Sequence, residues 1–279
     1  MTGERMRIEV DARKWRWLPD LTELWTHRDL LATLAMRDIR VRYAQTRLGL
    51  LWALVQPLVT LGIMVLVFHR AAKVDTAPVP YVLFAMSGIT AWTYFAFVLK
   101  ESGASLIGAQ EMVRKIYFPR LVIPLSKSMV GLMDLLVALL LLGLMFAMHG
   151  VMPPGRVLWL PVFLLGILMA GVGVGIWVSA LTIRFRDLQH VIPVLVQLGL
   201  FITPVAYPAE LVTDALPAAG QVAYFLNPMA GLTEGFRWSL LGTGTLGWPC
   251  AISVAMSVVL LLTGLVYFRS MERVVADLI

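Results

Sequence analysis

The sequence has 279 residues, of which 59% are hydrophobic and only 14% are charged. Soluble domains usually carry about 25% charged residues, so this composition excludes a single water-soluble globule. The lone cysteine, Cys250, excludes an intrachain disulfide and a cysteine-based metal site. The net charge of +6 does not indicate a nucleic-acid partner, because in a membrane protein the positions of Lys and Arg carry the information.

The N-terminal segment, residues 1–47, carries ten Lys and Arg residues and no long apolar run, so we expect no signal peptide. Polar side chains recur there every three or four residues, which is the spacing of one face of a helix. They are Thr22, Thr26, Asp29, Thr33, Arg37 and Arg40. We expect an amphipathic helix from about residue 20 to 44 that lies along the membrane surface. The alternative is a solvated helix that packs on a soluble partner.

Six apolar blocks follow, and together they predict the fold class. Runs of about 20 apolar residues can cross ~30 Å of hydrocarbon as helices, which satisfy their own backbone hydrogen bonds. The blocks cover residues 48–68, 79–99, 128–148, 157–183, 191–207 and 249–268. We predict an all-α polytopic membrane bundle with six transmembrane helices over residues 48–279, preceded by the N-terminal segment.

The distribution of Lys and Arg predicts the orientation of this bundle. Nineteen of the cations lie in the N-terminal segment, the connection after the second block, the loop after the fourth block and the C-terminal tail. Four lie on the other side, at Arg70, Lys73, Arg156 and Arg237. Cytoplasmic loops carry the excess of positive charge, so we expect both termini in the cytoplasm.

Asp134 is the only ionisable residue well inside an apolar block. A charge at that position costs roughly 2.5–3.5 kcal/mol on insertion scales, so we expect a partner across a helix interface. Lys127 is two helical turns away, too far for direct contact.

The fourth apolar block contains Gly171 and Gly175. Their four-residue spacing favours close helix packing over a nucleotide-binding loop.

Aromatic residues in the blocks are candidates for the lining of a pathway, because aromatic faces accept the apolar faces of sugar rings. The candidates are Trp52, Trp92, Tyr94, Phe95, Phe201 and Tyr207. The alternative for each is ordinary packing or a place in the interfacial aromatic belt.

Two connecting segments are candidates for moving parts. Residues 101–120 predict a short amphipathic helix that ends at Pro119 and could transmit motion to a soluble partner; an ordinary basic loop is the alternative. Residues 208–248 contain Pro208, Pro217 and Pro228 and fit no span. We expect two short re-entrant helices there that act as an outer gate, with a surface loop as the alternative.

Catalytic patterns are absent from the sequence. The four His residues are far apart, and no metal-binding or phosphate-binding motif occurs. We therefore expect no cofactor and no metal on this chain, and any ATP and Mg to be bound by a separate subunit. The lack of paired carboxylates or a His-based constellation also counts against a membrane-bound transferase.

Several motifs together are similar to one family. Residues 36–43, 45–46, 48–53, 56–57, 115–120, 184–187, 203–208 and 226–238 resemble, in order, the permease subunits of type-2 ABC exporters for polysaccharides such as O-antigen, capsule or teichoic acid. Many members carry an Asn within the stretch that corresponds to residues 103–110, where this chain has Gly103, Gly108 and Gln110.

The resemblance implies a homodimer in the inner membrane, with two ABC ATPase subunits, that exports a polysaccharide, lipid-linked or free. It implies that coupling loops contact the ATPases through Glu111, Arg114, Lys115, Tyr117, Phe118, Arg120, Arg184, Arg186 and Asp187. It implies an outer gate that includes Tyr224, Asn227, Pro228, Glu234 and Arg237. Export of a lipid or drug by the same kind of permease is the alternative.

Overall fold

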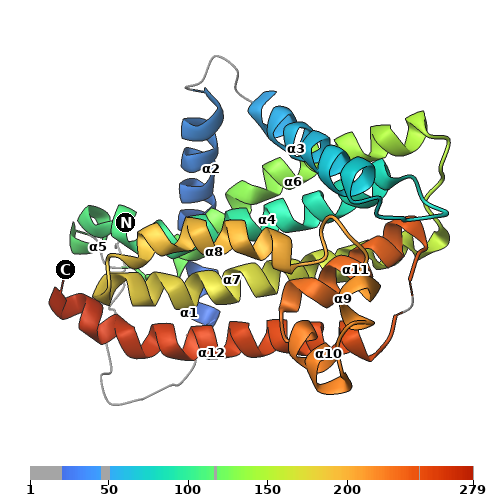
Figure 1. The fold of residues 1–279 in the computed structure, drawn as a ribbon. Helices are drawn as coiled ribbons and strands as arrows, with labels where there is room; N and C mark the ends of the chain where they lie inside the picture. Colours follow the sequence, from blue (N-terminus) through green and yellow to red (C-terminus); the bar gives the residue numbers. More distant parts are fainter. Residues whose placement is uncertain (1–20, 45–50, 116–117, 245, 279) are drawn as a thin grey trace.

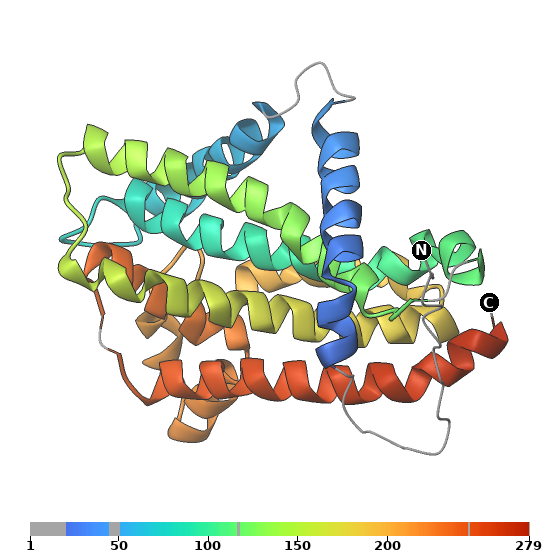
Figure 2. The ribbon, with the colours of Figure 1, turned by 180° about the vertical axis from the view of Figure 1, so that it is seen from behind.

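The structure is a computed structural model that describes residues 21–44, 51–115, 118–244 and 246–278. Within these ranges the chain is helical and contains no strand, as predicted (Figure 1). The long helices run side by side as a bundle, and the N-terminal helices lie across it (Figure 2).

Five helical segments in the described part of the chain are long and apolar enough to cross a bilayer. They are α3 (Leu51–Met64) with its π-helical continuation η1 (Val65–Ala71), α4 (Tyr81–Gly108), α6 (Val122–Met148), α7 (Leu160–Arg184) with the preceding 3-10 turn η2 (Gly155–Trp159), and α12 (Trp248–Leu278). Each corresponds to one of the predicted apolar blocks. These five helices confirm the membrane-bundle class.

The fifth predicted block forms a shorter helix than expected. This helix, α8 (Leu188–Ile202), has 15 residues, about 22 Å at the α-helical rise, and so falls short of ~30 Å of hydrocarbon. It stops because Thr203 has extended backbone, with φ −79° and ψ 142°, and the following Pro204 disfavours a helical residue before it. The expectation of six full-length spans is therefore not confirmed.

The core is built around α4, which packs against α7, α6, α11, α3 and α8. Small residues allow the close approaches. A Cβ on Gly171 would lie 3.1 Å from Val98, and one on Gly175 would lie 2.7 Å from the Cβ of Ser102. These two glycines of α7 thus serve helix packing against α4, as their spacing predicts.

The N-terminal helices are α1 (Leu21–Thr26) and α2 (Arg28–Ala44), and α2 crosses the bundle instead of joining it (Figures 1 and 2). The predicted polar stripe is exposed, whereas Leu34 and Ala35 are buried against the bundle. Trp25 of α1 is 69% exposed and does not join this contact with the bundle. Contact with a membrane surface remains a prediction.

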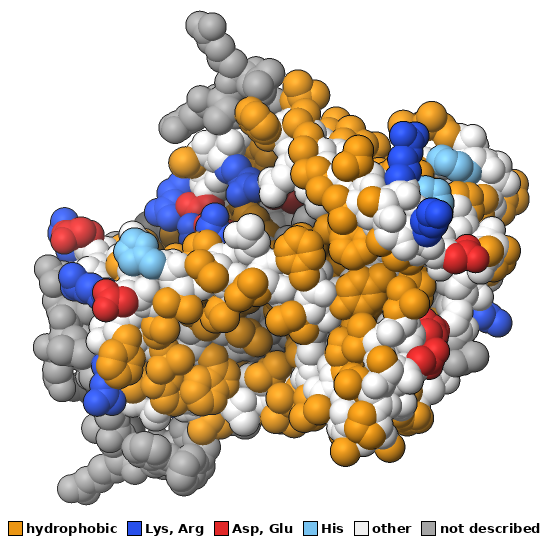
Figure 3. All heavy atoms as spheres, viewed as in Figure 1, with side chains coloured by type: hydrophobic (Ala, Val, Ile, Leu, Met, Phe, Trp, Pro, Cys, Tyr) orange, Lys and Arg blue, Asp and Glu red, His pale blue; other side chains and the backbone are white. Residues whose placement is uncertain are grey.

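The two ends of the bundle differ in the elements that they carry. One end, called here the α5 end, holds α5 (Gln110–Lys115), the α7–α8 turn and the C-terminal end of α12 (Figure 1). The opposite end, the α11 end, holds α9 (Glu210–Thr213), α10 (Ala218–Phe225) and α11 (Pro228–Leu241). Charged side chains gather towards both ends, and apolar side chains cover most of the face between them (Figure 3).

Candidate functional site

The residues predicted to couple to an ATPase gather at the α5 end. Arg184, Arg186 and Asp187 are exposed in the turn between α7 and α8. On α5, Glu111 and Lys115 form an exposed ion pair with an N–O distance of 3.6 Å. The structure thus brings both predicted coupling segments to one end, where a soluble protein could contact them together.

Three other coupling candidates differ from these exposed residues. Phe118 is only 6% exposed and belongs to the core, so its side chain anchors the segment and does not project from it. Arg120 is half-buried. Tyr117 and the side chain of Arg114 lie outside the described residues, so their role stays a prediction. The predicted helix of residues 101–120 is divided, because α4 continues to Gly108 and α5 follows.

Asp134 has the cross-helix partner that was predicted. Arg42 of α2 donates from Nη2 to Asp134 Oδ2 at 2.7 Å, and the Tyr43 hydroxyl donates to Oδ1. The Arg42 guanidinium also lies 4.6 Å from the ring centroid of Phe97 on α4. The C-terminal end of α2 is therefore attached to both α6 and α4 by charged contacts.

A second set of ion pairs lies further back along α2. Asp38 forms an ion pair with Lys127 of α6 at 2.8 Å and accepts a hydrogen bond from Arg37 at 2.8 Å. Burial raises the pKa of the Asp38 carboxyl, but hydrogen bonds and charge interactions with Lys127 and Arg37 outweigh it, so this pKa lies below its ordinary value. Asp38 is thus held ionised at neutral pH, and Lys127 serves α2 instead of Asp134.

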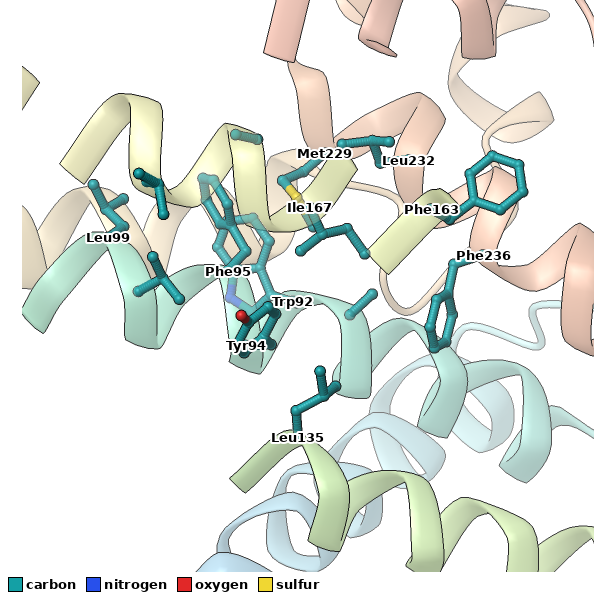
Figure 4. Packing of buried hydrophobic residues seen from close by; sticks show 14 of the residues in the cluster. Trp92, Tyr94, Phe95, Leu99, Leu135, Phe163, Ile167, Met229, Leu232 and Phe236 are labelled. Atoms are coloured by element: carbon teal, nitrogen blue, oxygen red, sulfur yellow. The ribbon is translucent and has the colours of Figure 1, made fainter. Parts of the chain in front are cut away.

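The six aromatic candidates separate into a buried and a surface group. Trp92, Tyr94 and Phe95 are 6%, 3% and 7% exposed and pack inside the bundle (Figure 4). In this structure they present almost no surface to a solute, which agrees with the packing alternative. The other three are accessible: Trp52 is 57% exposed, Phe201 is 54% exposed, and Tyr207 is partly exposed with its ring centroid 6.3 Å from that of Phe68.

Two polar residues beside these surface aromatics were missed. Gln56 on α3 and Gln197 on α8 are exposed although both helices are apolar. Each is four residues from an exposed aromatic, Trp52 and Phe201, and therefore lies on the same helix face. A carboxamide that faces hydrocarbon pays a desolvation cost. The signal in the sequence is the four-residue spacing between each glutamine and an aromatic residue within an apolar block.

The outer-gate candidates lie together at the α11 end. Asn227 caps α11, because its Oδ1 accepts from the backbone N–H of Met229 at 3.1 Å, and Pro228 takes the first helical position. The Tyr224 ring packs edge-on against Phe225 at 5.2 Å. Arg237 is fully buried and pairs with Glu234 at 3.0 Å. Prolines and a cap thus mark the helices that the sequence predicted here, although their place in a membrane remains a prediction.

No group of three or more His, Cys, Asp and Glu residues comes close enough to hold a metal ion within the described ranges.

Comparison with known proteins decides the family. The sequence model of a family described as the ABC-2 type transporter matches residues 29–241, which is most of the chain. The chain belongs to the ABC-2 type transporter family.

Relatives of this ABC-2 type transporter chain are similar to it over most of their length. It is 28% identical over 253 residues to the O-antigen export system permease protein RfbA of Klebsiella pneumoniae, covering 90% of this chain and 95% of the relative. It is also 28% identical to RfbA of Myxococcus xanthus, over 77% of this chain and 81% of that protein. The polysialic acid transport protein KpsM of Escherichia coli is 28% identical over 86% of this chain and 92% of its own length.

Proposed function

We propose that this chain is the channel-forming subunit of an ATP-driven exporter that moves a polysaccharide from the cytoplasm across the inner membrane. The observation that carries the proposal is the similarity, over nearly the full length, to permeases named for O-antigen export and polysialic acid transport. The five long apolar helices and the exposed coupling residues at the α5 end are what such a subunit requires.

In this proposal the α5 end faces the cytoplasm, because the cation-rich loops gather there. The short α8 then crosses together with the non-helical residues 203–208, which lead to the helices of the α11 end (Figure 1). This would make a sixth crossing and leave both termini in the cytoplasm. Broken helices at membrane depth are tolerated where protein or water surrounds them.

Two copies of the chain and two separate ATPase subunits would form the transporter. Helices α3 and α8 lie on the near side of the bundle in Figure 1, and Trp52, Gln56, Gln197 and Phe201 are exposed on these two helices. Aromatic faces can stack on sugar rings, and carboxamides can bond sugar hydroxyls. We therefore place the glycan pathway along these two helices, between the two copies.

The ATPases would act through the exposed ends of α5 and the α7–α8 turn. Closure of the ATPase pair on ATP would displace the turn that contains Arg184, Arg186 and Asp187, and with it the beginning of α8. The buried Phe118 would transmit the displacement of α5 to the core. No step of bond cleavage is assigned to this chain.

A gene-deletion experiment tests the export function. Cells that lack this chain should still synthesise the polysaccharide but retain it in the cytoplasm, and expression of the wild-type chain should restore it at the surface. Polymer levels at the surface would be measured with an antibody or lectin, and total polymer after lysis. Normal surface polymer in the deletion strain, with a lipid or drug retained instead, would contradict the proposal.

Cysteine labelling tests the orientation. In a Cys250→Ala background, Thr213→Cys near the α11 end should react with a membrane-impermeant maleimide added to intact spheroplasts. Arg186→Cys at the α5 end should react only after permeabilisation. Reversed accessibility at the two positions would overturn the orientation while leaving the family assignment intact.

Charge reversal tests the coupling residues. The Lys115→Glu and Arg186→Glu variants should keep normal levels in the membrane, because both side chains are exposed, but should lose export and stimulation of the ATPase. Phe118→Ala is unsuitable for this test because it removes a core side chain. Unchanged export in both charge-reversed variants would exclude these segments from coupling.

A further inference from the structure

Buried non-helical backbone follows α8 at the α11 end. Thr203 and Val205 are 0% exposed and Ala206 is 2% exposed. Carbonyl groups in such a stretch have lost the regular helical donors, and an unpaired buried carbonyl is costly, above all at membrane depth. Donors from other parts of the chain are therefore required to hold this segment.

Arg237 of α11 supplies most of these donors. Its Nη1 donates to the carbonyl of Pro204 and its Nη2 to the carbonyl of Val205, both at 2.5 Å. Its Nε reaches the carbonyl of Phe84 on α4 at 3.4 Å, and the guanidinium lies 3.7 Å from the Phe84 ring centroid. Because a guanidinium carries five donors in one plane, a single side chain joins three parts of the chain.

Two further contacts hold the same segment. The Tyr81 hydroxyl of α4 donates to the carbonyl of Ala206 at 2.9 Å, and Asn227 Nδ2 donates to Thr203 Oγ1 at 2.9 Å. The approach to α4 also depends on Gly88. A Cβ there would lie 2.5 Å from Arg237 Nη2 and 2.6 Å from the carbonyl oxygen of Val205, so no larger residue fits without displacement.

Glu234 balances the buried charge. Its Oε1 lies 3.0 Å from Arg237 Nη1, and the carboxylate side chain is 25% exposed whereas the arginine is 0% exposed. A buried arginine without a partner would be strongly unfavourable. The pair thus allows a permanent cation to remain among backbone carbonyls inside the protein.

The rest of α8 is held much more weakly. Ile192 is its only buried residue, and it lies against Gly103 of α4, while Gly199 lies against the Trp92 ring. Pro193 removes one backbone donor from the helix interior. One end of α8 is thus fixed by several hydrogen bonds, and the other end follows an exposed turn.

We propose that Arg237 is a positioning residue that fixes the far end of α8 to α4 and α11, so that α8 pivots about this end. The anchoring is a property of the folded chain alone. The pivoting rests on the proposed export function, because it assumes that an ATPase moves the α7–α8 turn. Arg237 then belongs to the stationary part of the transporter and is not itself a moving gate.

Accessibility of the anchored segment tests the proposal in the assembled transporter, without any substrate. A Val205→Cys reporter in a Cys250→Ala background should react slowly with a membrane-impermeant maleimide. Arg237→Gln should increase this reaction several-fold, and Arg237→Lys should increase it less, because an ammonium keeps the charge and three donors. The matched control is Arg156→Gln at the same end. Arg156 is exposed, donates to the carbonyl of Gly242 at 3.4 Å and lies 5.0 Å from the ring centroid of Trp238, so its substitution should leave the reaction unchanged.

Unchanged labelling in Arg237→Gln, at normal membrane levels, would overturn the anchoring. If Arg237→Gln does not accumulate, Gly88→Ala decides, because it keeps the arginine but forces the segment away from α4. Increased labelling in Gly88→Ala supports the proposal, and unchanged labelling overturns it.

The pivot has a separate readout. Arg237→Gln transporters should hydrolyse ATP at the wild-type rate per assembled complex while exporting several-fold less polymer, with partial recovery in Arg237→Lys. An equal fall in hydrolysis and export would show that the residue only supports assembly. Because labelling needs no polymer, loss of the export function itself would leave the labelling result valid.

Discussion

Helices α8 and α11 are similar in length, with 15 and 14 residues, but they occupy opposite environments. In α11 ten residues are buried, and in α8 only Ile192 is buried. The sequence predicted a membrane span for the α8 region, which is an apolar block, and short re-entrant helices for the α11 region, which is more polar and punctuated by prolines. Hydropathy therefore indicated which segments prefer lipid, and not which ones the protein encloses.

Glycines explain the difference between the two helices. A Cβ on Gly231 of α11 would lie 2.6 Å from Ser253 Oγ of α12, and one on Gly235 would lie 2.1 Å from the Phe163 ring of α7. Between helices in a membrane, close contact and polar bonds replace the hydrophobic effect as the source of attraction. Helix α11 thus comes close to α12 and α7 at two glycines, while α8 has one such glycine, Gly199, which lies against the Trp92 ring of α4.

The largest expected effect comes from truncating the same residue type on the two helices. Phe236→Ala on α11, where the side chain is 0% exposed, should lower the unfolding free energy by about 3 kcal/mol, because a buried ring leaves a cavity. Phe201→Ala on α8, 54% exposed, should change it by less than about 0.5 kcal/mol. Thermal unfolding of the two purified variants measures both changes in stability. Equal losses of stability would contradict the difference in burial between α11 and α8.

The same pair sharpens the functional assignment. Phe201→Ala should reduce polymer export although its stability is unchanged, because the ring is proposed to touch the glycan. Full export by Phe201→Ala and by Trp52→Ala would place the pathway elsewhere.

A smaller effect is expected from adding one methyl group at two helical glycines. Gly235→Ala should destabilise the protein by about 1–3 kcal/mol, because the Phe163 ring must move. Gly62→Ala on α3, where nothing lies within 4 Å of the added Cβ, should be neutral or slightly stabilising, since alanine favours helix more than glycine does. The melting temperature should fall in Gly235→Ala and should stay the same or rise slightly in Gly62→Ala. A Gly235→Ala variant as stable as wild type would contradict the packing argument.

The attachment of α2 differs from both helices, because it depends on charges. Asp134→Asn should cost about 1–2 kcal/mol, since Arg42 then loses a charged partner that is only partly exposed. A double-mutant cycle with Arg42→Gln measures the coupling between the two side chains. Additive losses would show that the 2.7 Å contact contributes nothing of its own.

The smallest effect is a dependence on pH. The pKa of Asp38 is lowered in the folded protein, so its contribution to stability is present above the ordinary pKa of aspartate and is lost as the pH falls through the lowered value. Acid should therefore loosen α2 from α6, and Asp38→Asn should remove that part of the pH dependence. The loosening is measured as the protease sensitivity of α2 between neutral and acidic pH. Identical pH profiles for wild type and Asp38→Asn would show that Asp38 is not the titrating group.

Much of the fold was predictable because the length of each apolar run can be counted in the sequence. The second and third apolar blocks marked α4 and α6, but both helices continue beyond them, to Gly108 and back to Val122. An apolar run in the sequence marks only the part of a helix that lies in hydrocarbon. The helix itself can continue into water as long as its backbone hydrogen bonds are satisfied. Pro204 marks the end of α8 in the sequence, but the burial of the backbone that follows depends on donors from Arg237, a distant residue on α11.

The candidate site was predictable only in part. The exposure of coupling candidates such as Arg186 follows from polarity beside a predicted span, and Asp134 required some partner because of its charge. The identity of that partner, Arg42, depends on how α2 crosses α6, which no local pattern encodes. Burial of Trp92 against Gly199 likewise depends on tertiary packing.

The crosswise position of α2 has one more consequence. The long helices and α5 reach beyond α2 on the α5 side (Figures 1 and 2), so the bundle carries short stalks on that side. If α2 lies at the headgroup level, these helix ends project into water. An ATPase could then bind them without contacting lipid. Lengthening or shortening these helix ends by whole helical turns would change the distance between the membrane and the docked ATPase, while the membrane-spanning bundle stays the same.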